Sequence, residues 1–181
     1  AFIALTDGEN TVHCIWKYKM GDTDPTNLDA IRLKDDANWI IYRMADVMLM
    51  KAEALIWKGK ENWQEAVDII NQIRTRANLL EKTIAIDEED ESSMMENYLL
   101  PERNIELAAE GKRWYDMIRY AKSKNYAHKS AFIALVQQYN TTANASWIRS
   151  VLQNEYAWYL PIHAGEIENN TLLVQNPYYG I

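Results

Sequence analysis

Apolar side chains recur every three to four positions along two neighbouring stretches of the chain. In residues 39–58 these side chains are Ile41, Ala45, Met48, Ala52 and Leu55, and in residues 63–78 they are Ala66, Val67, Ile70, Ile73 and Ala77. This period gives each of two helices one buried stripe. Gly59 stands between the stretches, where the first helix must end, and the acidic run 35–38 is expected to cap its beginning. The pattern predicts a helical hairpin over residues 39–78, with Ala52 and Ala66 at its closest approach.

A third stretch, residues 98–122, carries the same period. Its apolar residues are Leu100, Leu107, Trp114, Ile118 and Ala121. Pro101 suits the first turn of a helix, since its missing N–H would have no intrahelical partner there. Charged residues of opposite sign follow three or four positions apart: Arg103 and Glu106, Glu110 and Arg113, Lys112 and Asp116, Asp116 and Arg119. We therefore predict one long central helix with ion pairs along its surface. Gly111 costs such a helix about 1 kcal/mol and suggests a closely approaching neighbour.

The flanking regions are less regular. Residues 1–38 predict an irregular lead-in, and residues 123–181 predict short helices, at about 130–139 and 146–154, before a closing segment. The hairpin resembles a tetratricopeptide unit. The expected fold class is therefore all-α, with tetratricopeptide-like helical hairpins between irregular N-terminal and C-terminal segments.

Composition and charge narrow the possible functions. The 181 residues are 48% hydrophobic and 25% charged, with one cysteine, and no stretch approaches the length of apolar residues that a membrane span needs. The net charge of −7 argues against nucleic acid as a partner. The three histidines lie far apart and no phosphate-binding glycine loop is present, so we expect no metal and no cofactor. The carboxylates Glu102, Glu106 and Glu110 each have a cation nearby in the sequence, which disfavours a proton-holding acid. We expect a protein that is not an enzyme.

The charged residues of the central stretch form a recognisable string. Glu102-Arg103-x-x-Glu106-Leu107-x-x-Glu110-Gly111-x-Arg113-Trp114-x-Asp116-x-x-Arg119 resembles the C-terminal signature of SusD/RagB proteins. Two further windows, one within the hairpin and one over residues 159–179, also resemble this family, although His163 and Asn170-Thr171 depart from the usual pattern. The resemblance implies structural roles for Glu102, Arg103, Glu106, Glu110, Gly111, Arg113, Trp114 and Asp116.

The resemblance also implies a function and a location. Members of this family are nutrient-binding lipoproteins at the outer membrane of Bacteroidetes, where they pass glycans or similar nutrients to a SusC-like TonB-dependent transporter. We expect the chain to be the C-terminal portion of such a protein, lipid-anchored at the cell surface in its full-length form, with the anchor absent from this chain. The alternative is a helical-repeat scaffold for protein interactions that has no ligand site of its own.

The aromatic residues suggest where the chain would contact a ligand. Seven Trp and eleven Tyr stand against two Phe, and rings with a polar edge suit the stacking and hydrogen bonding that sugars need. Trp39, Trp63 and Trp114 fall at helix starts or on stripes and are expected in the core. Trp16 and Tyr18 lie in the irregular lead-in and are the candidate substrate-binding residues. The resemblance places most of the ligand site in the other half of a family member.

Overall fold

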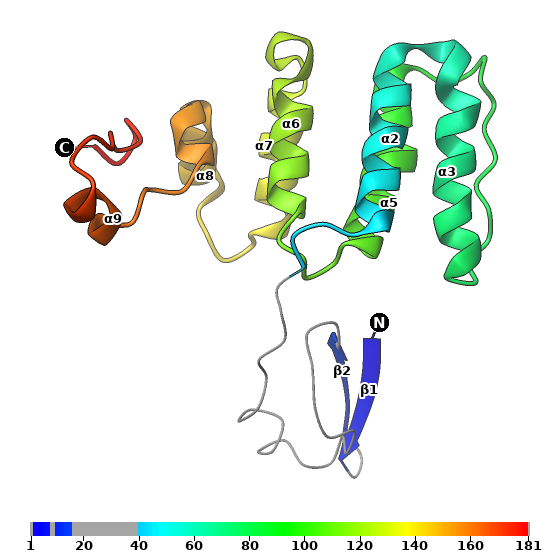
Figure 1. Cartoon of the computed structure of the whole chain (residues 1–181), viewed down its shortest axis with the longest axis horizontal. Coiled ribbons are helices and arrows are strands. Elements are labelled where there is room, and N and C mark those ends of the chain that lie inside the picture. Colours follow the sequence, from blue (N-terminus) through cyan, green and yellow to red (C-terminus); the bar gives the residue numbers. More distant parts are fainter. Residues whose placement is uncertain (1, 8–9, 16–39, 181) are drawn as a thin grey trace. The chain divides into compact units, whose positions relative to one another are not determined.

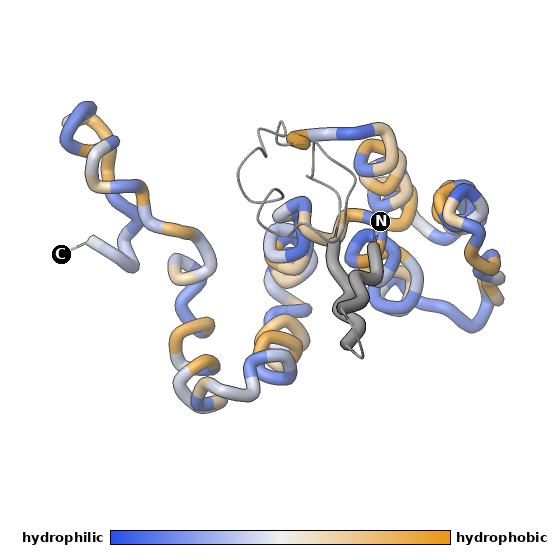
Figure 2. Tube along the Cα trace, turned by 90° about the horizontal axis from the view of Figure 1, so that it is seen from below, coloured by the Kyte–Doolittle hydropathy of each residue, from blue (hydrophilic) through white to orange (hydrophobic). Residues whose placement is uncertain are grey.

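The computed structural model describes residues 2–7, 10–15 and 40–180, and helices dominate this part of the chain (Figure 1). The residues divide into two compact units, Ala1–Arg113 and Trp114–Ile181, which are described separately below. Figure 2 shows hydrophobic and hydrophilic positions interleaved along the helices, as expected for helices with one buried face. The predicted all-α class is confirmed, with one addition in the lead-in.

That addition is a β-hairpin in the segment predicted to be irregular. Strand β1 (Phe2–Asp7) pairs antiparallel with β2 (Asn10–Ile15), in a register that sets Phe2 opposite Ile15 and Asp7 opposite Asn10. The aliphatic and β-branched residues of both segments favour extended backbone. Asp7 and Asn10, which pair at one end of the ladder, are residue types that favour strand ends and turns.

The first unit contains the predicted helical hairpin. Helix α2 (Met44–Lys58) is followed by a 3-10 turn, η1 (Lys60–Asn62), and by α3 (Trp63–Arg76), and α2 and α3 pack side by side (Figure 1). Gly59 ends α2 with a φ of 125°, a conformation that L side chains rarely adopt. The Trp63 indole N–H donates to the Ile56 carbonyl at 3.1 Å and so satisfies a group at the end of α2. The core of the hairpin is formed by Ala45, Leu49, Ala52, Leu55, Ile56, Trp63, Ala66, Val67, Ile69, Ile70 and Ile73.

The start of the hairpin differs from the prediction. Helix α2 begins at Met44 rather than near residue 39, and the predicted acidic cap at 35–38 lies outside the described residues. Arg43, the N-cap residue, has an extended backbone with φ −142° and ψ 163°. The carbonyl of Ile41 accepts a hydrogen bond from Lys112 Nζ at 2.5 Å instead of one from a following helical turn. Ile41 is therefore 67% exposed and does not belong to the buried stripe; Ala77, after the end of α3, is exposed as well.

The single long helix predicted over residues 98–122 is wrong. A short helix α4 (Glu91–Ser93) leads into a π-helical stretch, η2 (Met94–Leu99), and then into α5 (Leu100–Glu106), which has Pro101 in its first turn. After α5 the backbone of Ala109 and Gly111 enters the left-handed region, with φ of 65° and 72°. Those two residues break the helix, and α6 (Arg113–Tyr126) starts anew. Gly111 is thus explained by a turn rather than by a close neighbour.

The link between α3 and α4 is held by side chains of α3. Asn71 pairs with the backbone of Lys82 in both directions, donating to its carbonyl and accepting from its N–H at 2.8 Å each. Arg74 Nε donates to the Leu80 carbonyl at 2.7 Å. Asp90 caps α4 by accepting from the Ser93 N–H at 2.7 Å. These bonds fix the route of a segment that has no regular secondary structure.

The second unit continues α6 with four short elements. They are α7 (Lys129–Tyr139), α8 (Ala145–Gln153), the 3-10 turn η3 (Glu155–Trp158) and α9 (Ala164–Asn169). Helices α7 and α8 confirm the helical pieces predicted at 130–139 and 146–154. The side chain of Asn144, in the predicted loop, caps α8 by accepting from the N–H groups of Ser146 and Trp147.

The core of this unit is aromatic. Phe132 makes edge-on contacts with Trp158 at 5.0 Å and with Trp114 at 5.4 Å between ring centroids. The Trp158 indole donates to the Leu152 carbonyl at 2.9 Å, and the Trp114 indole donates to the Trp158 carbonyl at 2.7 Å. Trp158 is almost fully buried, whereas Trp114 is half-buried. Each large ring therefore buries its apolar face while its N–H remains satisfied.

The closing segment is fastened by amide side chains. Gln175 accepts from the Ile162 N–H and donates to the Ile162 carbonyl, both at 2.9 Å. Asn176 donates to the carbonyls of Tyr156 and Tyr159 at 2.9 and 3.2 Å. The two ends of the window over residues 159–179 are thereby joined, although few apolar contacts are available to hold them.

The left-handed turn between α5 and α6 predicts opposite changes in stability for substitutions at Ala109 and Gly111. Gly111→Ala should destabilise the chain by about 1 kcal/mol, because a Cβ is disfavoured at positive φ. Ala109→Gly should stabilise it by a few tenths of a kcal/mol to about 1 kcal/mol, because it relieves the same penalty and only partly loses that gain to unfolded-state entropy. Urea denaturation of both variants measures the two effects. Equal signs for the two changes would contradict the turn described here.

Candidate functional site

The family-motif residues are distributed over α5, the turn after it and the start of α6. Glu102, Arg103 and Glu106 lie on α5, Glu110 and Gly111 lie in the turn, and Arg113, Trp114 and Asp116 lie on α6. Among the predicted local ion pairs, Arg119 contacts Asp116 at 2.9 Å as expected. Glu102, Arg103, Glu106 and Glu110 instead pair with side chains of the hairpin, so most of the charged motif residues link segments that are distant in the sequence.

The most deeply buried of these links joins α5 to α2. Arg103 Nη2 donates to Asp46 Oδ1 at 3.0 Å, and the two side chains are 2% and 0% exposed. Lys112 Nζ lies 3.3 Å from the second oxygen, Asp46 Oδ2, and 4.4 Å from the centroid of the Tyr42 ring. One carboxylate therefore faces two cations, which is what a charge removed from water requires.

A second cluster forms around the N-cap residue of α2. The Arg43 guanidinium binds Glu110 through Nε and Nη2, at 3.0 and 2.8 Å, and binds Glu106 Oε1 through Nη1 at 2.5 Å. It also donates to the backbone carbonyl of Glu106 at 2.6 Å, and Arg76 Nη2 reaches Glu106 Oε1 at 2.5 Å. The planar guanidinium of Arg43 thus binds Glu106 on α5 and Glu110 in the following turn at the same time.

Electrostatics in this cluster favour the charged forms. Burial alone would lower the pKa of Arg43, but its hydrogen bonds to Glu110 and Glu106 outweigh burial and raise it. Burial alone would raise the pKa of Glu106, but its hydrogen bonds to Arg76 and Arg43 outweigh burial and lower it. Glu106 is consequently held as a carboxylate in the folded chain.

A third link ties α3 to α5. Arg74 Nη1 donates to Glu102 Oε2 at 2.7 Å, while its Nε holds the Leu80 carbonyl. Glu102 is almost fully buried. Nearby, burial and the charge of Arg74 lower the pKa of Lys82, although Glu102 acts in the opposite direction. Arg113 Nη1 donates to the Leu100 carbonyl at 3.1 Å and joins the start of α6 to the start of α5.

The three links together clamp α2, α3 and α5. We call this set the charge clamp; it consists of Arg43, Asp46, Arg74, Arg76, Glu102, Arg103, Glu106, Glu110 and Lys112. Each of its carboxylates faces at least one cation, an arrangement that suits fastening helices better than transferring protons. Within residues 40–180 and the two strands, no three His, Cys, Asp or Glu side chains gather as a metal ion would require. No helix in the same part of the chain is both long and apolar enough to cross a membrane.

Sequence reasoning identified half of this clamp. It singled out the residues of α5 and of the turn after it but assigned them local partners, and it gave no role to Arg43, Asp46, Arg74 or Arg76. Asp46 carried a usable signal, because it stands next to Ala45 and three residues before Leu49 on a buried helix face. The arginines at the helix ends carried no such signal, since charges there are ordinarily solvated. The predicted ligand residues Trp16 and Tyr18 lie outside the described residues.

Comparisons with known proteins agree on one family. A model of the SusD family matches residues 5–179 of the chain. Two SusD-like proteins of Formosa agariphila, P38 and P2, are 40% and 32% identical over 96 and 152 residues. These matches cover 49% and 81% of this chain but only 18% and 27% of the relatives.

A solved structure agrees in fold. A SusD superfamily protein from Bacteroides thetaiotaomicron is similar, with a TM-score of 0.54 and 28% identity, over 78% of this chain and 26% of that protein. The chain therefore spans roughly a quarter of the length of such proteins.

The buried link between α5 and α2 predicts a large loss of stability on mutation. Asp46→Asn keeps the shape of the side chain but removes the negative charge that Arg103 and Lys112 both face. We expect a loss of about 3–5 kcal/mol in urea denaturation. Glu65→Gln is the matched control: it removes an exposed pair with Lys51 and should cost less than about 1 kcal/mol. Comparable losses in the two variants would mean that the link is not buried as described.

The charge clamp also predicts an acid dependence that can be assigned to Glu106. The pKa of the Glu106 carboxyl is lower in the folded than in the unfolded chain. Its contribution to the free energy of unfolding is therefore complete above the ordinary pKa range of glutamate, and it is lost as the pH falls through the pKa of the folded chain. Glu106→Gln should therefore be clearly less stable than the native chain at pH 7, and the difference should shrink as the pH falls below about 4. Urea midpoints measured between pH 3 and 7 test this. A difference independent of pH would contradict it.

Proposed function

Because the chain belongs to the SusD family, we propose that it forms part of a cell-surface protein that binds a glycan or a similar nutrient and passes it to a TonB-dependent outer-membrane transporter. The observation that carries this proposal is the family match, which extends over nearly the whole chain. The proposed partner is a SusC-like transporter, and the proposed location is the outer membrane, with a lipid anchor on the full-length protein.

The physical character of the first unit supports binding rather than catalysis. The buried carboxylates of the charge clamp are engaged by arginine and lysine side chains, and the pKa of Glu106 is lowered rather than raised. A general acid at neutral pH needs the opposite shift. The clamp instead joins three helices through charge-assisted hydrogen bonds, which gives a stiff support on which binding loops can be held in place.

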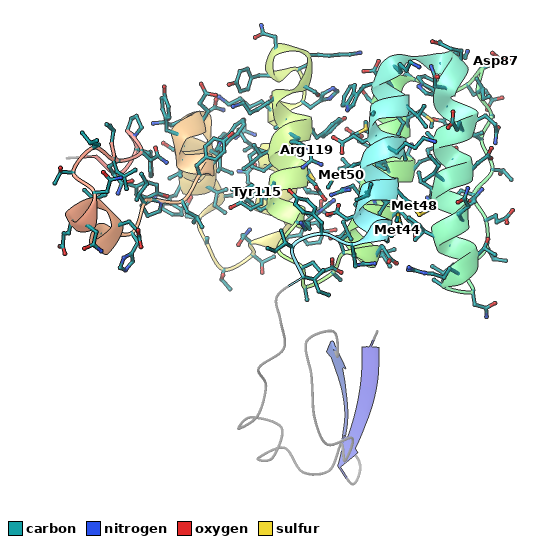
Figure 3. All side chains as sticks on the ribbon, viewed as in Figure 1. Met44, Met48, Met50, Asp87, Tyr115 and Arg119 are labelled. Carbon is teal, nitrogen blue, oxygen red and sulfur yellow. The ribbon has the colours of Figure 1, made fainter. Side chains whose placement is uncertain are left out.

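The alternative, a protein-interaction scaffold, has one observation in its favour. Tyr42, just before α2, and Met44 and Val47, in its first turn, are exposed, and Met44, labelled in Figure 3, is 74% exposed. Exposed apolar side chains of this kind are a feature of surfaces that contact other proteins. A native gene product that captures a transporter but binds no member of a glycan panel would favour the scaffold.

The proposal predicts how binding divides between this chain and the native gene product. If two aromatic side chains of this chain stack on a sugar, each contributes about 1–3 kcal/mol to the free energy of binding, by analogy with base stacking. The cost of immobilising the ligand must be subtracted from this sum. We therefore expect millimolar binding by the isolated chain in calorimetry with neutral and acidic oligosaccharides. The native gene product should bind its glycan much more tightly, because most of the site lies elsewhere. Absence of glycan binding by the native gene product would refute the proposed function.

A further inference from the structure

Four side chains meet where the end of α6 approaches η3 in the second unit. Lys122 Nζ donates to the Tyr159 hydroxyl at 3.2 Å and lies 3.9 Å from Glu155 Oε2. The Tyr126 hydroxyl donates to the same carboxylate oxygen. The Lys122 ammonium also lies 5.8 and 5.5 Å from the ring centroids of Tyr126 and Tyr159. We call Lys122, Tyr126, Glu155 and Tyr159 the tyrosine cluster.

The backbone beneath the tyrosine cluster is unusual. Lys124, Asn125 and Tyr126 have φ of 49°, 57° and 66°, so three successive residues other than glycine adopt the left-handed region. Such conformations are disfavoured for L residues and persist where surrounding contacts enforce them, often at functional sites. Here they bring Tyr126 against Glu155 and, edge-on at 6.0 Å, against Trp158.

The opposite side of the cluster is fixed by the core and by the closing segment. Trp158, next to Tyr159, is buried and its indole is held by the Leu152 carbonyl. Asn154 caps η3 by accepting from the Tyr156 N–H at 3.1 Å, and Asn176 holds the Tyr159 carbonyl at 3.2 Å. Tyr159 is therefore positioned before any ligand arrives, which reduces the entropic cost of binding.

The tyrosine cluster is nevertheless open to solvent. Tyr159 is 38% exposed, and the side chains of Lys122 and Glu155 are each 40% exposed. One cation and one carboxylate cancel, so the cluster presents no net charge of its own. It offers ring surface, an N–H donor and a carboxylate acceptor side by side. Those are the groups that bind a ring with an apolar face and hydroxyls around its edge.

We propose that the tyrosine cluster binds one ring of a neutral oligosaccharide, with Tyr159 stacking on the sugar face, Lys122 donating to a hydroxyl and Glu155 accepting from one. This inference rests on the proposed glycan-binding function and names a site within this chain. The site is separate in the sequence from Trp16 and Tyr18. A neutral sugar fits because a charged one would have to displace one member of the Lys122–Glu155 pair.

The test is an NMR titration of the 181-residue chain, labelled with ¹⁵N, against neutral glucan, mannan and galactan oligosaccharides and an acidic galacturonan. Amide shifts should change at residues 122–126 and 155–159 on adding a neutral sugar. Tyr159→Ala should weaken that binding at least about five-fold, the effect of losing one stacked ring. Tyr159→Phe should keep most of it, since the ring remains. Tyr139→Ala removes a 74% exposed tyrosine outside the cluster and should leave the titration unchanged.

Several results would overturn the site. Unaltered binding in a folded Tyr159→Ala variant, or shifts confined to other residues such as Trp16 and Tyr18, would refute the cluster and leave the proposed function intact. If the native gene product binds a glycan but the amide shifts of this chain do not change at tens of millimolar sugar, the cluster is likewise refuted and the proposed function stands. Preference for the galacturonan would refute the neutral ligand class. Absence of glycan binding by the native gene product as well would refute both proposals.

Discussion

The ion pair between Arg103 and Asp46 is the interaction on which the first unit depends. A carboxylate and a guanidinium that are both removed from water cost free energy unless their partners are in place. Asp46 lies in the first turn of α2 and Arg103 lies in the middle of α5, so their 3.0 Å contact specifies how the two helices meet. Apolar packing alone tolerates small slips between helices, whereas a buried pair with Lys112 on its second oxygen does not. We infer that burial of apolar side chains stabilises the hairpin and that the charge clamp sets the register of α5 against it.

The break after α5 belongs to the same arrangement. If α5 continued as a helix through Ala109 and Gly111, Glu110 and Lys112 would follow the helical path and leave the start of α2. The left-handed backbone at Ala109 and Gly111 ends the helical path, and Arg43 binds Glu106 on the helix and Glu110 in the turn. The backbone penalty at Ala109 is thus offset by charge-assisted bonds to one arginine. The second unit uses other means, since its core combines aliphatic side chains with aromatic rings, among them two tryptophans whose indole N–H groups are satisfied.

The sequence was sufficient for features that depend on neighbours along the chain. The stripes with Ala52 and Ala66 and the stop at Gly59 gave the α2–α3 hairpin, and the polar run at 140–144 separated α7 from α8. It was not sufficient where contacts between distant segments decide the outcome. Leu107 and Trp114 keep helical spacing across a turn, so periodicity alone continued the helix through it. Charges three or four residues apart are compatible with local pairs, and the spacing carries no information about Arg43, Arg74 and Arg76. The family resemblance marked Glu102, Arg103 and Glu110 as structural, but only the fold shows which partners make them so.

The two units use charged side chains in different ways. In the charge clamp the carboxylates of Asp46 and Glu102 are enclosed, and enclosed charges are unavailable to a ligand. The tyrosine cluster has the reverse character: Lys122 and Glu155 neutralise one another but stay near the surface, where each retains hydrogen-bonding capacity that a sugar hydroxyl can use. Burial of Trp158 and the hold of Asn176 on Tyr159 supply the rigidity that exposed charges cannot. A weak sugar contact of this kind gains strength when it acts together with a second site on the same glycan, because the second contact is then intramolecular. In the function we propose, the tyrosine cluster is therefore an auxiliary contact whose effect depends on a principal glycan site elsewhere in the native gene product.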